Sequence, residues 1–224
     1  MPQSAYYMRV PSRLLISVLL AAAPAISQAP ARTAADIPSI KESHEGFTVE
    51  AAPWTSKEHY KARFPKKTPM DGGAIAIDVV LRNDSDQPLH VNLNRIRLLL
   101  LPPESDRQQI YPLSPADLAD LVFHPAAKQP TAPRSRVPLP IPRTGSGSGK
   151  SKQWDEFRAA ADSVAIGAEV VAPHASVHGL LYFDLAGQFD LMEYARLYVP
   201  EVTVLGADKS LLYFDLDLSQ TGGR

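Results

Sequence analysis

Period-two alternation of apolar residues is the feature that most limits what this chain can fold into. It is clearest at Ala74–Arg82, where Ile75, Ile77, Val79 and Leu81 share one face. Successive side chains of a strand point to opposite faces, so this pattern is typical of a half-buried strand. Shorter segments of strand character lie at 47–51, 89–100, 169–172, 176–185, 195–205 and 210–218. The chain is therefore predicted to be mainly β, with about seven strands.

Breaks in the alternation predict the turns and the helices. The apolar phase changes between Leu89–Leu93 and Ile96–Leu100, and a slip of one residue would turn the core face outward. We therefore expect a bulge or bend near Asn92–Arg95. Short helices are predicted over 56–64, from the Ser-Pro pair at 114–115 onward, and over 152–164, because each begins at a residue suited to N-capping or carries an apolar stripe.

Short strands joined by turns, with helices only in the connections, favour an immunoglobulin-like antiparallel β-sandwich of two sheets. Val79–Asp84 and His178–Phe183 resemble segments of exported bacterial proteins of unknown function that have such a sandwich. Asp190–Tyr194, just before a strand, is similar to the tyrosine corner of these folds. The resemblance implies the fold and supplies no catalytic residues.

The first 29 residues are predicted to be a cleavable secretory signal peptide. Arg9 and Arg13 precede an apolar run of 13 residues, Leu14–Ile26, which is shorter than the roughly 20 residues that span a bilayer core. Small residues offer two cleavage sites, Ala25-Ile26-Ser27 and Ala29-Pro30-Ala31. The chain has no cysteine, so it is not a lipoprotein. We expect a periplasmic or extracellular protein with no transmembrane segment after cleavage.

Residues 125–152 are predicted to be a disordered linker between two parts of the β domain, 46–124 and 153–219. They contain six prolines, three glycines, six basic residues and no acid. A flexible mature N-terminus is expected over 30–45 and a tail over 220–224. The net charge of −1 argues against nucleic acid as a partner. The basic linker, in contrast, suits weak contact with an anionic surface.

The sequence lacks residues that the motifs of common catalytic and cofactor sites require. A cysteine nucleophile is excluded, and neither G-x-S-x-G nor H-E-x-x-H is present. Thr144–Ser151 is similar to a phosphate loop, but Thr stands where that motif needs Gly. Prolines also precede the segment, at 138, 140 and 142, where the motif requires a buried strand. We therefore expect no cofactor and no catalytic residue.

His174 and His178 are the weak candidates for a metal site. Four residues of extended strand span about 13 Å, so both rings reach one ion only if Pro173–Ser176 forms a tight turn. A metal site also needs a third ligand, which the sequence does not reveal. Histidines at the rim of the domain are the simpler interpretation.

Five further residues are candidates for ligand contact: Asp184, Asp215, Asp217, Tyr182 and Tyr213. Asp215 and Asp217 lie on one face of the last strand. Paired carboxylates serve glycoside hydrolysis or calcium binding, although they more often form a solvated face. Both tyrosines are predicted to point outward and to offer stacking area.

The hexapeptide Leu-Leu-Tyr-Phe-Asp-Leu occurs twice, at 180–185 and 211–216, and both copies are predicted to be core strands. The side chains expected to be buried are Leu181, Phe183, Leu185, Leu212, Phe214 and Leu216. Asp184 and Asp215 should not lie directly opposite each other, because like charges facing across strands are destabilising.

The function predicted from sequence is an exported, non-catalytic binding or structural module whose partner is an envelope protein or polymer. Two alternatives stay open. One is a hydrolase of envelope polymers that uses Asp184, Asp215 and Asp217; the other is a metal-handling periplasmic protein that uses His174 and His178. Three or more such side chains converging in a concave pocket would favour an alternative.

Overall fold

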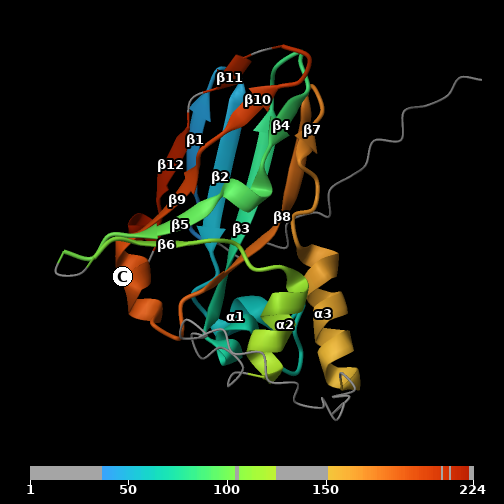
Figure 1. The fold of residues 1–224 in the computed structure, drawn as a ribbon, viewed down its shortest axis with the longest axis vertical. Helices are drawn as coiled ribbons and strands as arrows, with labels where there is room; N and C mark the ends of the chain where they lie inside the picture. Colours follow the sequence, from blue (N-terminus) through green and yellow to red (C-terminus); the bar gives the residue numbers. More distant parts are fainter. Residues whose placement is uncertain (1–36, 104–105, 125–150, 208, 212, 222–224) are drawn as a thin grey trace, which may run out of the picture.

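The described part of the chain forms three antiparallel sheets of four strands, with short helices gathered at one end (Figure 1). This computed structural model describes residues 37–103, 106–124, 151–207, 209–211 and 213–221. The predicted signal peptide and all but the last two residues of the predicted linker lie outside the described residues. The prediction of a mainly β protein is confirmed.

The longest strands form one sheet, in the order β1-β2-β3-β8. Its members are β1 (Ile40–His44), β2 (Phe47–Pro53), β3 (Ala74–Asn83) and β8 (Ala175–Asp184). Glu45 and Gly46 join β1 to β2 with positive φ angles of 47° and 80°, as a two-residue hairpin turn requires. Because β1 begins at residue 40, the predicted flexible N-terminus over 30–45 extends too far along the chain. The segment 40–44 consists mostly of polar residues, so the strand that it forms at the edge of the sheet was not predicted.

The other two sheets have the orders β11-β10-β4-β7 and β12-β9-β5-β6. The first contains β4 (Leu89–Val91), β7 (Val170–Val171), β10 (Val202–Val204) and β11 (Lys209–Leu211). The second contains β5 (Arg97–Leu100), β6 (Gln108–Ile110), β9 (Ala195–Val199) and β12 (Phe214–Asp217).

Three segments that were each predicted as one strand are divided between these two sheets. They become β4 and β5, β9 and β10, and β11 and β12. The first division is a 3-10 turn, Leu93–Arg95, at the place where the phase change predicted a bulge or bend. With the divisions, and with β1 and β6 added, the described residues hold twelve strands where about seven were predicted.

One core is shared by all three sheets. Phe47, Val49, Ile77, Leu98 and Phe214 are among its fully buried side chains. The inward positions of β3 match the predicted alternation. Burying apolar area at about 25 cal/mol per Å² makes this core the main source of stability.

A second core lies between the helices and the outer face of β3 and β8 (Figure 1). It is formed by α1 (Lys57–Tyr60), α2 (Pro115–Phe123) and α3 (Lys152–Val164). The start of β3 is therefore buried on both faces, where a half-buried strand was predicted. The predicted range of α3 is confirmed, although Lys152 now belongs to the helix and not to the linker. The first helix ends earlier than predicted, at Tyr60 instead of Phe64.

The two copies of the hexapeptide have different surroundings. In the copy at 180–185, Leu181, Phe183 and Leu185 face the main core as predicted, but Tyr182 is only 1% exposed and lies in the second core. In the other copy, Phe214 and Leu216 are buried and Tyr213 is 54% exposed. Leu212 lies outside the described residues.

The aspartates of the two copies do not face each other. Asp184 is opposite Ala74 in the β1-β2-β3-β8 sheet, whereas Asp215 is opposite Tyr198 in the β12-β9-β5-β6 sheet. The predicted separation of these like charges is confirmed.

Side-chain hydrogen bonds hold the edge strand β12 and the turn that follows it. Glu42 of β1 accepts a hydrogen bond at 2.7 Å from the backbone N–H of Asp215, on the edge strand β12. The final 3-10 turn, Leu218–Thr221, buries Thr221, whose hydroxyl donates to the Leu218 carbonyl at 2.6 Å. Part of the predicted tail is therefore packed.

Candidate functional site

A row of four side chains crosses the outer face of the β12-β9-β5-β6 sheet: Tyr111, Arg97, Tyr198 and Tyr213. We call it the tyrosine–arginine row. Arg97 and Tyr198 are paired directly across β5 and β9. Tyr111 follows Ile110, which pairs with Leu98, so Tyr111 comes opposite Arg97. Tyr213 shares a face with Asp215, the partner of Tyr198, because residues two apart in an extended segment point the same way.

The four side chains of the row contact one another in sequence. The guanidinium carbon of Arg97 lies 5.8 Å from the ring centroid of Tyr111 and 5.8 Å from that of Tyr198. The rings of Tyr198 and Tyr213 are 5.6 Å apart at their centroids and tilted by 40°. These distances are within the ranges of cation–π and aromatic contacts. Tyr111 and Tyr213 are each 54% exposed, so the two ends of the row present aromatic surface to solvent.

Among the described residues, Arg97 lacks the carboxylate partner that the neighbouring arginines Arg95 and Arg196 each have. Its Nη1 donates to the side-chain Oε1 of Gln109 at 2.8 Å, and its Nε is buried with no hydrogen-bond partner in the described residues. Arg95, in the turn before β5, pairs with Glu201, and Arg196 pairs with Asp215 at 2.9 Å. Among the described residues Arg97 has no carboxylate partner, in contrast to Arg95 and Arg196.

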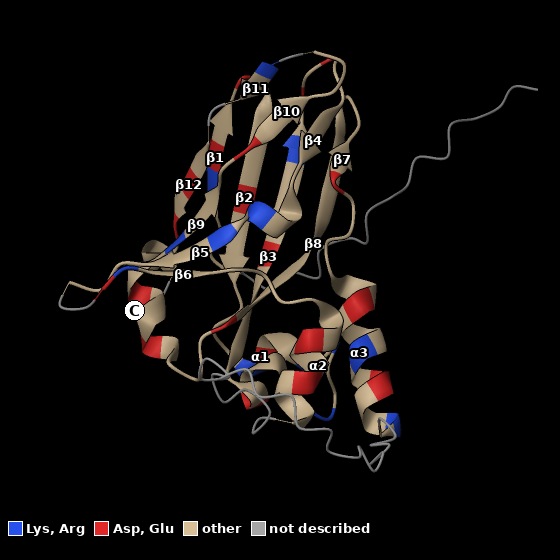
Figure 2. Ribbon diagram, in the orientation of Figure 1, with Lys and Arg blue, Asp and Glu red and all other residues tan. Residues whose placement is uncertain are grey.

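Asp215 and Asp217 lie on one face of β12, as predicted. This face also carries the tyrosine–arginine row. Asp215 holds Arg196 and raises the pKa of that guanidinium by its hydrogen bond. The hydroxyl of Ser219 donates to Asp217 at 2.6 Å and lowers the pKa of that carboxyl. Figure 2 shows basic positions on β5 and acidic positions on β12, so this face carries both signs of charge.

The two candidate histidines bind different aspartates. His174, which has a positive φ of 52°, lies 2.9 Å from Asp86 in an exposed turn. His178 lies 2.6 Å from Asp78, a carboxylate that is only 6% exposed on the neighbouring strand β3. Over the part of the chain that the structure describes, no three histidine or acidic side chains gather in a group that could hold a metal ion.

The remaining candidates are placed apart from the row. Tyr182 was predicted to point outward, but it is buried under α3, where its hydroxyl donates to the Ala161 carbonyl at 3.0 Å. The prediction is wrong because the sequence did not reveal that helices cover this face of β8. Asp184 ends β8 and accepts a hydrogen bond from the backbone N–H of Ala186 at 2.9 Å. It belongs to a different sheet from Asp215 and Asp217.

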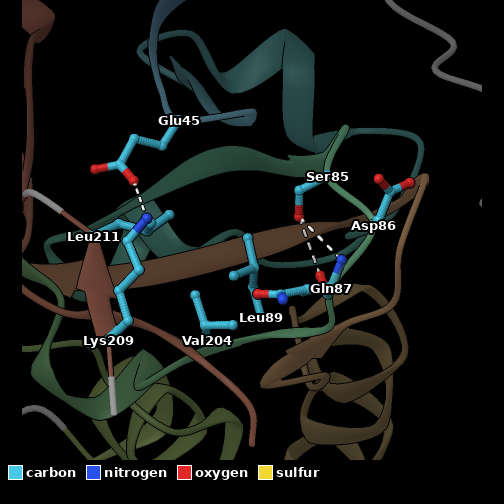
Figure 3. A pocket seen from close by; sticks show the side chains of 8 residues that line it. All are labelled: Glu45, Ser85, Asp86, Gln87, Leu89, Val204, Lys209 and Leu211. Atoms are coloured by element: carbon cyan, nitrogen blue, oxygen red, sulfur yellow. Dashed lines mark hydrogen bonds and ion pairs between the residues drawn. The ribbon is translucent and has the colours of Figure 1, made fainter. Parts of the chain in front are cut away.

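A small cleft of about 230 Å³ lies at the end of the fold opposite the helices (Figures 1 and 3). Its wall includes Leu89, Val204 and Leu211, and its rim includes Glu45 and Asp86. Figure 3 shows Lys209 reaching across to Glu45, with which it forms an ion pair. Asp86 is held by His174. Both acids at the rim are therefore already paired, and the cleft is a weaker candidate than the row.

Sequence reasoning found Tyr213, Asp215 and Asp217 but missed Arg97, Tyr111 and Tyr198. Tyr198 lies in a segment that was predicted as a strand, whereas Tyr111 follows β6, which was not predicted. The sequence also does not give the register between distant strands. A usable signal was present at the phase change near residue 95, since it turns Arg97 outward while Leu98 stays in the core.

Comparisons with known proteins add little. No family model matches the chain, and no curated protein matches it. Among solved structures, a functionally unknown protein from Listeria monocytogenes EGD-e is similar over 80% of this chain and 82% of that chain, with 12% sequence identity and a TM-score of 0.36. None of the helices that the structure describes is both long and apolar enough to span a membrane.

Proposed function

We propose that this protein is an exported, non-catalytic binding module of the cell envelope and that the tyrosine–arginine row is its contact surface. The observation that carries the proposal is the exposure of Tyr111 and Tyr213 at the two ends of a contiguous row. Tyrosine and arginine are enriched where proteins bind partners, because both combine a large apolar area with polar groups.

The proposal includes an immunoglobulin-like sandwich as the scaffold. Its support is the single core shared by three antiparallel sheets, together with the strands that pass from one sheet into the next. Such a scaffold holds a sheet face rigid, which lowers the entropy lost when a ligand binds.

The acids near the row favour binding over hydrolysis. A general acid needs a pKa raised toward the working pH, whereas Ser219 lowers the pKa of Asp217. Asp215 is held in an ion pair with Arg196. Both carboxylates are thus held by neighbouring side chains, which orders the surface beside the row.

Co-sedimentation with envelope fragments from the native organism tests the proposal. The purified chain without residues 1–29 should pellet with the fragments. Tyr213→Ala and Tyr111→Ala should each reduce the bound fraction, since each removes an exposed ring. Both side chains are more than half exposed, so the melting temperature should change little.

Tyr194 provides a matched control. It is 39% exposed, lies in the 3-10 turn Phe189–Tyr194, and is not part of the row. Tyr194→Ala should bind envelope fragments as the unmodified chain does. Equal loss of binding in Tyr194→Ala and Tyr213→Ala, or no binding by the unmodified chain, would contradict the proposal.

A further inference from the structure

We infer that the tyrosine–arginine row binds a polysaccharide that carries carboxylate groups at low density. This inference rests on the proposed function and names the ligand class of the same surface. It follows from the direction of the row, from the chemistry of its side chains and from the charges around it.

The row runs across the strands and not along them. It passes over β6, β5, β9 and β12, which are three inter-strand spacings of about 4.8 Å, so its length is about 14 Å. A ligand that covers all three rings must therefore be extended and longer than a single sugar. An extended peptide gains most of its affinity by pairing with a sheet edge, and the row lies on a sheet face, where the backbone groups are already paired.

The side chains of the row match the two surfaces of a sugar ring. A pyranose has a face of C–H groups, which packs on an aromatic ring, and a rim of hydroxyls, which needs hydrogen-bond partners. Tyr111 and Tyr213 offer exposed ring surface, and the half-buried Tyr198 lies between Arg97 and Tyr213. The tyrosine hydroxyls, with Gln109 and Asp215 beside them, supply polar groups. This combination is absent from a purely apolar docking surface.

Arg97 selects for an anionic group on the ligand. It lies between two tyrosine rings, has no carboxylate partner among the described residues, and uses only Nη1 in a hydrogen bond with the protein. A carboxylate can pair with a guanidinium through two parallel hydrogen bonds. One such pair at the middle of the row would fix the position of a chain whose sugar rings stack on either side.

The surrounding charges exclude a densely charged polymer. Arg95 and Arg196 are each neutralised by a carboxylate, Glu201 and Asp215, and Asp217 adds a further negative charge. Nucleic acids and polyuronates require a continuous basic groove, whereas Arg97 is the one cation of the row, and it has no carboxylate partner in the part of the chain that the structure describes. The ligand that fits is therefore sparsely charged.

Affinity electrophoresis in native gels tests this inference with defined polymers. The probes are hyaluronan, in which a carboxylate alternates with neutral sugars, carboxyl-reduced hyaluronan, uncharged dextran and densely charged polygalacturonate. Hyaluronan should retard the purified chain most strongly. Arg97→Gln should raise the dissociation constant for hyaluronan about tenfold, the loss expected for one charge-assisted contact, and should raise that for the carboxyl-reduced form much less. Tyr198→Ala should weaken binding to both forms.

Controls separate the inference from the proposed function. Arg82→Gln removes an exposed arginine of the β1-β2-β3-β8 sheet, which pairs with Asp84, and should bind hyaluronan as the unmodified chain does. Stronger retardation by polygalacturonate, equal retardation of Arg97→Gln, or binding to phosphatidylglycerol vesicles but not to hyaluronan would overturn the inference. If no polymer binds while co-sedimentation with envelope fragments still depends on Tyr213, the ligand class is wrong and the binding module stands. If both assays fail, both proposals fall.

Discussion

Gly179 of β8 offers the sharpest test of how the helices are attached to the sheet. A Cβ at this position would lie 2.5 Å from the backbone nitrogen of Ile166 and 2.8 Å from the carbonyl carbon of Ala165. Both contacts are with backbone just after α3, so relief requires the chain itself to move. The same movement would stretch the 3.1 Å hydrogen bond from Ile166 N–H to the Leu180 carbonyl.

The expected cost of Gly179→Ala is the sum of these two effects. Overpacking costs about 1–3 kcal/mol, and the lost hydrogen bond about 1 kcal/mol. A loss of roughly 2–4 kcal/mol corresponds to a fall in melting temperature of roughly 5–15 °C for a chain of this size. Intrinsic preference acts in the opposite direction, because glycine in a strand is less favourable than alanine. The sign of the change in the free energy of unfolding therefore shows whether the packing effect or the intrinsic preference is larger.

Chemical denaturation followed by tryptophan fluorescence measures the change, since Trp154 lies on α3. Gly167→Ala is the matched control: a Cβ there meets nothing within 4 Å, and φ is not positive. It should change the free energy of unfolding by no more than about 0.5 kcal/mol. If Gly179→Ala is as stable as Gly167→Ala, the segment after α3 is not held against β8 as described, and the reasoning is refuted.

Four further predictions concern the core, pH, the linker and export. Phe183→Ala should lose about 3–5 kcal/mol in urea melts, because its side chain is fully buried. Ser219→Ala should cost roughly 1 kcal/mol at pH 7, and this cost should vanish in acid: the folded-state pKa of Asp217 is lowered, so the stabilisation is present above its unfolded pKa and lost as pH falls through the folded value. Replacing Lys128–Lys150 by a short Gly/Ser bridge should leave the melting temperature nearly unchanged and weaken binding to anionic vesicles at low salt. Mass spectrometry of the native protein should find a chain that begins near Gln28–Arg32; an intact Met1 would contradict export.

The spacing of apolar residues and the positions of turn-forming and capping residues predicted most strands and helices, because these features are local properties of the sequence. The predicted strand Ala74–Arg82 has the same first residue as β3 and ends one residue earlier than β3 does. The helix α3 has its predicted bounds. The polar strand β1 was missed because its exposed positions carry Lys41 and Ser43 and its inward ones include Glu42, so hydrophobic alternation is weak.

The identical hexapeptides show why the site was predicted only in part. Tyr182 and Tyr213 lie in the same hexapeptide, yet a helix covers Tyr182, whereas Tyr213 is 54% exposed. The difference arises from α2 and α3, which pack on β8 although neither is part of its local sequence. Local sequence cannot distinguish the two tyrosines. The row also depends on the register of β5 with β9, which is a long-range pairing.

The hydrogen bond between Glu42 and Asp215 has a consequence for self-association. An edge strand with free N–H groups is a template on which another molecule's strand can add, and this is a route to aggregates. Because the Glu42 carboxylate occupies the Asp215 N–H, that part of β12 is closed to an incoming strand. A single side chain on β1 thus blocks strand addition at this position of β12, and Glu42→Ala would free that N–H group without removing any residue of the core.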